Sequence, residues 1–340
     1  MSSAAAPTPR HFLNLDDYSP DEVERLLGLA EELRGKRTLT TLAGKSIVLL
    51  FFDPSLRTRV SMELAAAELG ARTVVLSPGK DSWTLEPREG AVMDGAFTEH
   101  VKEAAKVLSR YGDCLGLRAF PKRRSWDEDR AEPVTAAFAR WSDVPLVNLE
   151  SSLYHPCQSL ADVYTLRRAL GRKPGKVLLT WANHPKALPT AVPNSFALGA
   201  TQQGWDLTIA HPEGYDLPAD VIDRCRRNAE RAGSRLEVTH DRDAAFAGAR
   251  VVYAKSWGRL DMYGRDEEEI AARRERGLAR WIVDGPAMAR TDGAKFMHCL
   301  PVRRNVVVAD EVIDSPSSII YDQAENRLHV QKAVLSYLLS

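Results

Sequence analysis

A short polar turn joins an apolar segment to a helical pattern in the stretch FFDPSLRTRVSMELAAAELG, residues 51–70. Ser55, Arg57 and Thr58 of this turn supply two hydroxyl groups and one guanidinium group. The first turn of a helix presents unpaired backbone N–H groups and a positive dipole end, which attract an anion. A guanidinium binds phosphate through two parallel hydrogen bonds. Ser55-Leu56-Arg57-Thr58 is therefore a candidate phosphate site, although the same four residues could simply cap a helix.

No nucleotide-binding motif explains this turn. It has no Walker lysine, and the chain contains no G-x-G-x-x-G sequence. A nicotinamide-dependent dehydrogenase on similar sheets would need that glycine-rich fingerprint after the first strand of one domain. The dehydrogenase alternative is therefore disfavoured.

Polar residues also follow four other apolar segments. They are Arg118 after CLGL, Glu150 after LVNL, Lys255 after VVYA, and residues 298–301 after KFM. In open parallel sheets, ligands bind at the carboxyl ends of the strands. We therefore expect these residues and the turn at 55–58 to line one shared site.

Short apolar segments alternate with helical patterns along most of the chain. We predict strands at 45–52, 71–77, 113–120, 144–150, 176–182, 206–212, 235–241 and 251–256, and helices at 18–33, 58–69, 98–111, 155–171, 192–204, 218–233, 243–249 and 324–339. Such alternation implies parallel sheets with right-handed crossovers. Two series, joined near residues 150–170, predict an α/β fold of two doubly wound parallel-sheet domains with the active site in the cleft between them.

Composition argues against several classes of partner. The net charge is zero, whereas a nucleic-acid-binding surface needs an excess of lysine and arginine. No apolar run approaches the roughly 18 residues of a membrane span. The four cysteines form no CxxC pair, which is typical of a reduced, cytoplasmic protein without a zinc or disulfide framework. The first ten residues resemble a flexible tail more than a signal peptide.

Three motifs occur together in one chain: SLRT at 55–58, HPCQ at 155–158 and HCLPVRRN at 298–305. In this order and setting, the chain resembles the aspartate and ornithine carbamoyltransferase family from about residue 10 to its C-terminus. The aspartate branch has HPLP where this chain has His298-Cys299-Leu300-Pro301, so the ornithine side is favoured.

A lysine separates this chain from plain ornithine carbamoyltransferases, which carry an SMG loop for the free α-amino group. The corresponding segment here is YAKSWG, and Lys255 suits an acceptor whose α-amine is blocked by an acyl group. With GKDSW, VMDGAFTEH, LRAFPK and AENRLHVQ, the chain looks like the N-acylornithine carbamoyltransferases of an alternative arginine pathway.

The resemblance implies a set of site residues, domains and partners. Carbamoyl phosphate would be bound by Ser55, Leu56, Arg57, Thr58, Arg118, His155, Pro156, Cys157, Gln158, Cys299, Leu300 and Arg327, and by Trp83 from a neighbouring subunit of a homotrimer. The acylated ornithine would be held by Glu150, Lys255 and Leu300, and the catalytic residues would be Arg57, Arg118, His155 and Cys299. The implied divisions are a tail at 1–10, a carbamoyl phosphate-binding domain at 11–152, an acylornithine-binding domain at 153–318, and a C-terminal helix at 319–340 that packs back on the first domain. Direct transfer needs neither a metal nor an organic cofactor.

Each of these residues also has a purely structural alternative. Arg118 could form a strand-end ion pair, His155 could cap a helix, Trp83 could be a surface aromatic, and Cys299 could be a buried thiol. A covalent mechanism through Cys299 and zinc at the adjacent His298 are both disfavoured. A catalytically silent relative that still binds carbamoyl phosphate is another alternative, although such a chain would be expected to lose Arg57, His155 or Cys299.

Thr98 bears on which acyl group is accepted. The acetyl-accepting branch has a glutamate at this position and the succinyl-accepting branch has a proline. A glutamate would repel the terminal carboxylate of a succinyl group, and threonine removes that repulsion. The spacing of Glu150 from His155 and the presence of Val307 resemble the succinyl branch, whereas HPCQ, GKDSW and ENRLHVQKA resemble the acetyl branch. We expect N-acetylornithine as the acceptor, with N-succinylornithine as the alternative.

Overall fold

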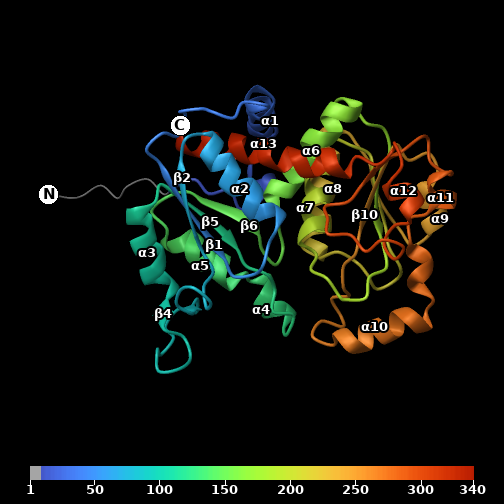
Figure 1. The fold of residues 1–340 in the computed structure, drawn as a ribbon. Coiled ribbons are helices and arrows are strands. Elements are labelled where there is room, and N and C mark those ends of the chain that lie inside the picture. Colours follow the sequence, from blue (N-terminus) through green and yellow to red (C-terminus); the bar gives the residue numbers. More distant parts are fainter. Residues whose placement is uncertain (1–8) are drawn as a thin grey trace.

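The computed structural model describes residues 9–340, and the predicted tail at 1–10 lies almost entirely outside the described residues. Two parallel sheets lie side by side (Figure 1). The first has the order β2-β1-β5-β6, formed by β1 (Ser46–Phe51), β2 (Arg72–Leu76), β5 (Cys114–Arg118) and β6 (Leu146–Glu150). The second has the order β11-β10-β7-β8-β9, formed by β7 (Val177–Trp181), β8 (Leu207–Ala210), β9 (Leu236–Thr239), β10 (Val251–Lys255) and β11 (Lys295–Met297). A small pair, β3 (Leu85–Glu86) and β4 (Glu99–His100), lies apart from both.

Helices flank both sheets. In the first half of the chain they are α1 (Pro20–Leu33), α2 (Arg57–Glu68), α3 (Val101–Tyr111), α4 (Trp126–Arg130) and α5 (Pro133–Trp141). In the second half they are α6 (Pro156–Leu170), α7 (Ala191–Gln202), α8 (Ala219–Ala232), α9 (Arg242–Phe246), α10 (Asp266–Glu275), α11 (Gly285–Met288), α12 (Asp310–Ile313) and α13 (Ile320–Leu339). Short 3₁₀ turns lie before α1, at Leu15–Asp17, and between α10 and α11, at Leu278–Trp281. The predicted α/β class with two parallel sheets is confirmed. The boundaries at residues 152 and 318 stay predictions.

Burial explains why the central strands are uninterrupted apolar segments. β1 lies between β2 and β5, and all its residues from Ile47 to Phe51 are buried. A parallel strand covered by helices on both faces has no side that needs polar residues. Gly116 on β5 allows this close packing, because a Cβ there would lie 2.6 Å from Cδ2 of Leu49.

Local signals set where α1 and α2 begin and end. Ser19 Oγ accepts from the N–H of Glu22 and the Glu22 carboxylate accepts from the N–H of Ser19, which forms a capping box. α2 ends just before Gly70, whose φ of +86° is readily adopted only by glycine.

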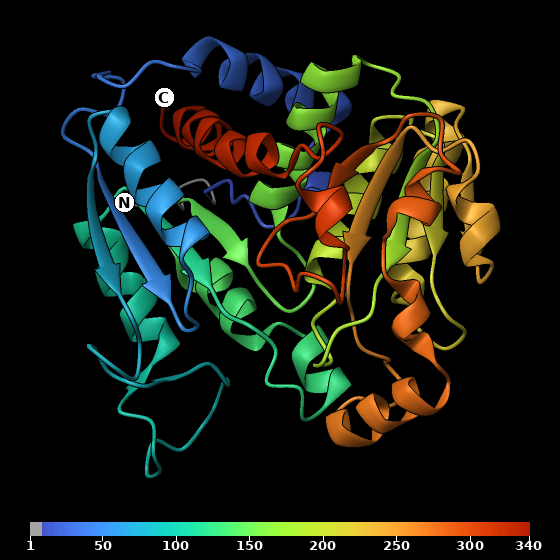
Figure 2. The same ribbon diagram turned by 45° about the vertical axis from the view of Figure 1, so that its right-hand side comes forward.

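The long helix α13 returns from the second sheet and packs against α1, α2 and α6 (Figure 2). It therefore brings side chains from the end of the chain back to the start of α2. No helix within residues 9–340 is long and apolar enough to cross a membrane.

Candidate active site

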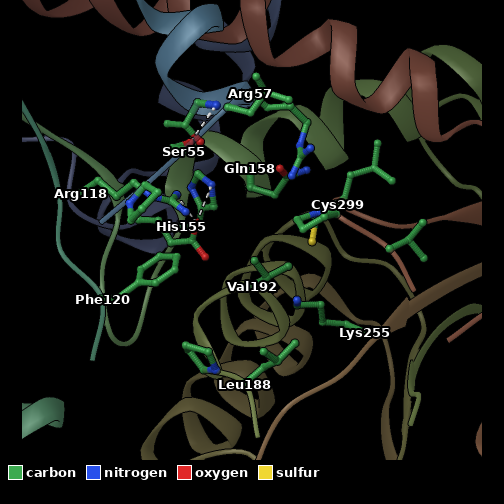
Figure 3. Close-up of a pocket in the computed structure, with 18 of the residues that line it drawn as sticks. Ser55, Arg57, Arg118, Phe120, His155, Gln158, Leu188, Val192, Lys255 and Cys299 are labelled. Carbon is green, nitrogen blue, oxygen red and sulfur yellow. Dashed lines mark hydrogen bonds and ion pairs between the residues drawn. The ribbon is translucent and has the colours of Figure 1, made fainter. Parts of the chain in front are cut away.

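A cavity of about 610 Å³ lies between the two sheets, next to the carboxyl ends of β1, β5, β6, β10 and β11 (Figure 3). In Figure 3, Ser55, Arg118 and His155 lie on one side of the cavity and face Leu188, Val192 and Lys255 across it. Most residues predicted for the site line this cavity, namely Ser55, Leu56, Arg57, Thr58, Arg118, Glu150, His155, Gln158, Lys255, Cys299, Leu300 and Arg327.

The polar turn that opens α2 is both a helix cap and part of the cavity wall. Ser55 Oγ accepts a hydrogen bond from the N–H of Thr58 at 3.2 Å, so the capping interpretation of Ser55 holds. The half-buried guanidinium of Arg57 makes no hydrogen bond or ion pair with any side chain or carbonyl of residues 9–340. Burial lowers the pKa of Arg57, yet it remains a cation. The turn thus presents an unpaired positive charge at a helix N-terminus, which is the chemistry of an anion site.

A second guanidinium reaches the same wall from α13. Arg327 is buried, and its Nη2 donates to Thr58 Oγ1 at 3.0 Å while its Nη1 donates to Gln158 Oε1 at 2.7 Å. Arg327 Nε is buried and has no partner within the described chain. α2, α6 and α13 therefore converge on one positively charged region.

Glu150 contacts Arg118 and His155, which lie on the same side of the cavity as Ser55 (Figure 3). Its Oε2 accepts from Arg118 Nη1 at 2.5 Å and lies 3.5 Å from Nε2 of His155. The backbone of Glu150 has a φ of +141°, a region that non-glycine residues rarely adopt and that costs of order 1–3 kcal/mol. The backbone is thus strained at the end of β6, at the residue whose side chain enters the cavity. The predicted strand-end ion pair of Arg118 is present in the structure.

His155 occupies the cap position of α6, but its side chain makes no capping hydrogen bond. Its backbone N–H donates to Ser195 Oγ at 2.7 Å, and its ring Nδ1 is buried without a partner in residues 9–340. Burial, followed by the charges of Arg327, Arg118 and Lys255, lowers the pKa of His155 well below 6.5. The imidazole is therefore neutral and offers hydrogen bonds rather than charge.

The segment 298–301 approaches the cavity from β11. The N–H of His298 donates to Gln323 Oε1 at 3.0 Å, and the N–H of Leu300 donates to His298 Nδ1 at 2.9 Å. Leu300 itself has a φ of +56°. Burial raises the pKa of the Cys299 thiol, whereas a nucleophilic cysteine needs a thiolate. This environment does not favour covalent catalysis through Cys299.

Several cavity residues were missed from the sequence, notably Phe120, His184, Leu188, Val192 and Arg303. His184 follows the end of β7, so the rule that selected the other clusters would also have found it. Arg303 is the charged residue among them that the sequence could not distinguish from its neighbour Arg304. Its neighbour Arg304 pairs with Asp310 and Asp314, whereas Arg303 forms no ion pair within residues 9–340.

Four residues predicted for the site do not line the cavity of the single chain. Trp83 and Thr98 are exposed on the segment between β2 and α3, with 65% of Trp83 accessible. Pro156 and Cys157 are buried in the first turn of α6, and the Cys157 thiol points toward the carbonyl of Asn148 at 3.9 Å. Burial raises the pKa of Cys157 to about 11. Their predicted contacts with substrate stay predictions.

Comparison with known protein families matches both halves of the chain. Residues 10–168 match the carbamoyl-P binding domain of aspartate/ornithine carbamoyltransferases, and residues 189–338 match the Asp/Orn binding domain of the same enzymes.

Relatives with two different acyl acceptors are similar over most of their length. The chain is 47% identical to N-acetylornithine carbamoyltransferase of Xanthomonas axonopodis pv. citri over 97% of each chain. It is 39% identical to N-succinylornithine carbamoyltransferase of Bacteroides thetaiotaomicron over 87% of each chain.

The fold also matches solved structures. A crystal structure of acetylornithine transcarbamylase complexed with acetylcitrulline superposes with a TM-score of 0.95 at 46% identity, covering 97% of this chain and 99% of the other. With both domain matches and this similarity in one chain, the protein belongs to the aspartate/ornithine carbamoyltransferase family.

Proposed function

We propose that this protein transfers the carbamoyl group of carbamoyl phosphate to the δ-amine of N-acetyl-L-ornithine, giving N-acetyl-L-citrulline and phosphate in arginine biosynthesis. The observation that carries this proposal is the unpaired guanidinium of Arg57 at the start of α2, across the cavity from Lys255. The similarity to N-acetylornithine carbamoyltransferases over nearly the whole chain supports it.

Carbamoyl phosphate would lie against the first domain. Its phosphate would accept hydrogen bonds from the first N–H groups of α2, from Ser55 and Thr58, and from the guanidinium of Arg57. Arg118 and the neutral imidazole of His155 would donate to the carbonyl oxygen, where negative charge develops in the transition state.

The acylated ornithine would lie against the second domain. Lys255 and Arg303 are cations on the cavity wall that suit the α-carboxylate of the acceptor. The same charges would repel the α-ammonium group of free ornithine, whereas an acylated α-nitrogen is neutral. The charges of Lys255 and Arg303 therefore favour an N-acyl acceptor over free ornithine.

The transfer is a single displacement. The neutral δ-amine attacks the carbamoyl carbon, the new C–N bond forms, and the C–O bond to phosphate breaks. The departing phosphate takes the extra proton of the amine. Closing the cleft over both substrates supplies proximity and excludes water.

The second candidate acceptor is N-succinylornithine, because Thr98 puts no negative charge where the acetyl-accepting branch has a glutamate. Solved structures of glutamate variants of N-acetyl-L-ornithine transcarbamylase, one of them a change to alanine, are complexes with carbamyl phosphate and N-succinyl-L-norvaline. In those variants, replacement of a glutamate accompanies the binding of an N-succinyl ligand.

We also propose that the protein forms a homotrimer in which neighbouring subunits share each active site. Apolar side chains are exposed along α2 and the edge strand β2, including Leu56, Val60, Leu64 and Val74. Trp83 projects from the next loop and is available to a neighbouring subunit. The four free thiols support a reducing, cytoplasmic location.

To test this function, product formation from carbamoyl phosphate would be measured in parallel with N-acetylornithine, N-succinylornithine, ornithine and aspartate as acceptors. Activity with an acylated ornithine and none with ornithine is expected. The variant Thr98→Glu should suppress any activity with N-succinylornithine and spare N-acetylornithine. Activity with ornithine would contradict the role of Lys255, and binding of carbamoyl phosphate without transfer to any acceptor would favour a silent relative.

A further inference from the structure

The buried carboxylate of Asp162 connects two parts of the cavity lining through hydrogen bonds, although Asp162 itself does not line the cavity. Asp162 lies on α6, has no exposed surface, and is absent from the cavity wall. Its Oδ1 accepts one hydrogen bond from Nε2 of Gln158 and one from Nε2 of Gln323, each 2.7 Å long. Gln158 lies one turn earlier on α6, and Gln323 comes from the first turn of α13.

The first branch leads to the phosphate side of the cavity. Gln158 Oε1 accepts from Nη1 of Arg327 at 2.7 Å, and Nη2 of Arg327 donates to Thr58 Oγ1 at 3.0 Å. The orientation of the Gln158 amide therefore helps to hold Arg327 against the first turn of α2.

The second branch leads to the loop after β11. Gln323 Oε1 accepts from the backbone N–H of His298 at 3.0 Å, and His298 Nδ1 accepts from the N–H of Leu300 at 2.9 Å. The orientation of the Gln323 amide therefore holds the loop that carries Cys299 and Leu300.

The direction of both amides follows from the chemistry of one carboxylate. Burial raises the pKa of Asp162 to about 7, so the carboxylate and the carboxylic acid are both present near neutral pH. Oδ1 accepts hydrogen bonds in the carboxylate, and also in the acid when the proton is on Oδ2, so each glutamine turns its NH₂ toward Oδ1 and its oxygen away from it. The guanidinium of Arg327 and the N–H of His298 favour the same orientation from the other end of each amide, because both groups only donate. Without the Asp162 acceptor, each buried NH₂ loses its partner and each amide is held from one end only. A reversed amide would present its NH₂ to Arg327 or to the His298 N–H, where donor would face donor.

We propose that Asp162 is a positioning residue for carbamoyl transfer, because it holds the NH₂ ends of Gln158 and Gln323 and thereby keeps Arg327 and the 298–301 loop in place. The inference rests on the proposed function for its kinetic readout. Asp162 acts through these neighbours and makes no contact with substrate.

Two substitutions at one position separate hydrogen bonding from packing. Asp162→Leu keeps the branched shape and the number of heavy atoms, with larger methyl groups in place of the oxygens, and it accepts no hydrogen bond. Asp162→Asn keeps one oxygen for both glutamines, and its NH₂ faces the hydroxyl of Tyr253. That hydroxyl is near enough to affect the pKa of Asp162, yet is buried without a well-formed partner in the described chain.

Thr165→Val is the matched control, because it removes another buried α6–α13 hydrogen bond, from Asn326 Nδ2 to Thr165 Oγ1 at 2.8 Å. We expect Asp162→Leu to lower kcat/KM about 100-fold through the loss of two buried hydrogen bonds, with weaker binding of carbamoyl phosphate and lower kcat. Asp162→Asn should retain activity to within about tenfold, and Thr165→Val to within about twofold.

A folded Asp162→Leu variant with activity near that of the unmodified chain would overturn the proposal, as would an equal loss in Thr165→Val. If Asp162→Leu fails to fold, Gln323→Met removes only the second branch. It should lower kcat and weaken the binding of carbamoyl phosphate less than Asp162→Leu does, because Gln158 still holds Arg327. An unchanged kcat together with an unchanged dissociation constant would refute the role. Calorimetric binding of carbamoyl phosphate tests the first branch even if the unmodified chain transfers nothing, so failure of the proposed function remains distinguishable.

Discussion

At the scale of single residues, the cavity combines unpaired cations with neutral hydrogen-bond donors. Arg57 carries charge without a protein partner, whereas His155 is kept neutral by burial and by nearby cations. A dianionic leaving group needs the first property, and a developing oxyanion needs donors that are already oriented. Each property can be removed separately, so each leads to its own prediction.

Arg57→Gln should lower kcat/KM about 100- to 1,000-fold, the usual cost of removing one preorganised donor from a transition state. Arg57→Lys should recover only part of this loss, because an ammonium group cannot bind phosphate through a planar fork. Steady-state kinetics with carbamoyl phosphate and N-acetylornithine provide the measurement. Arg59→Gln is the control, since Arg59 lies two residues further on and pairs with Glu63 at 3.0 Å on the exposed face of α2. Equal losses in both variants would mean that the substitutions merely destabilise α2.

The neutrality of His155 predicts a particular pH dependence. Because its pKa lies well below 6.5, raising the pH from about 6 to about 9 should not change its protonation state. The ratio of kcat/KM between the unmodified protein and His155→Gln should therefore be constant over this range, whatever the substrate amine contributes to each profile. A ratio that collapses below pH 7 would show that His155 titrates in the working range and that its environment is more polar than the structure indicates.

At the scale of elements, α13 depends on one buried ammonium group. Lys332 is fully buried, and its Nζ donates to the carbonyls of Leu33 and Lys36 and to Glu68 Oε2, each at 2.8 Å. These acceptors belong to the end of α1, the turn after it, and the end of α2. Lys332 therefore fastens α13 to the two helices beside which Arg327 must be placed.

Lys332→Met should destabilise the folded protein by about 3 kcal/mol, because it leaves Glu68 and two carbonyls without their buried partner. Thermal unfolding would measure the change as a lower Tm. Lys36→Met is the control, since its exposed pair with Glu32 spans 3.5 Å and contributes under about 1 kcal/mol. Adding Glu68→Gln to Lys332→Met should recover part of the lost stability. A Tm unchanged by Lys332→Met would mean that packing alone holds α13.

At the scale of the whole molecule, the sequence predicted the elements better than the contacts between them. The strand at 45–52 was recognisable because burial on both faces requires continuous apolar residues, and Arg118 and Glu150 were recognisable because strand ends meet at one edge. Arg303 was missed because its neighbour Arg304 has the same residue type, and only the fold shows which one is unpaired. The role proposed for Asp162 depends on α13 returning beside α6, which no local pattern indicates.

A second contact between distant parts of the chain lies where α4 approaches α10. Arg123 donates from Nη2 to Asp266 Oδ1 at 2.9 Å, and Tyr263 donates to Asp129 Oδ2 at 2.7 Å. The rings of Trp126 and Tyr263 meet edge to face with centroids 5.4 Å apart. These contacts join the half of the chain that carries Arg57 to the half that carries Lys255.

If these contacts stabilise the closed cleft, Asp266→Asn and Tyr263→Phe should each raise KM for N-acetylornithine by about tenfold, since a hydrogen bond to a charged group contributes about 1.5–3 kcal/mol. Binding of carbamoyl phosphate to the first domain should change little, because its predicted contacts remain intact. Steady-state kinetics and calorimetry would separate the two effects. Asp261→Asn is the control, because Asp261 pairs with Arg259 two residues away, at 2.5 Å, without bridging α4 and α10. An equal rise in KM for Asp261→Asn and Asp266→Asn would show that the contact between α4 and α10 does not stabilise the closed cleft. Weaker binding of carbamoyl phosphate in parallel with weaker binding of the acceptor would show the same.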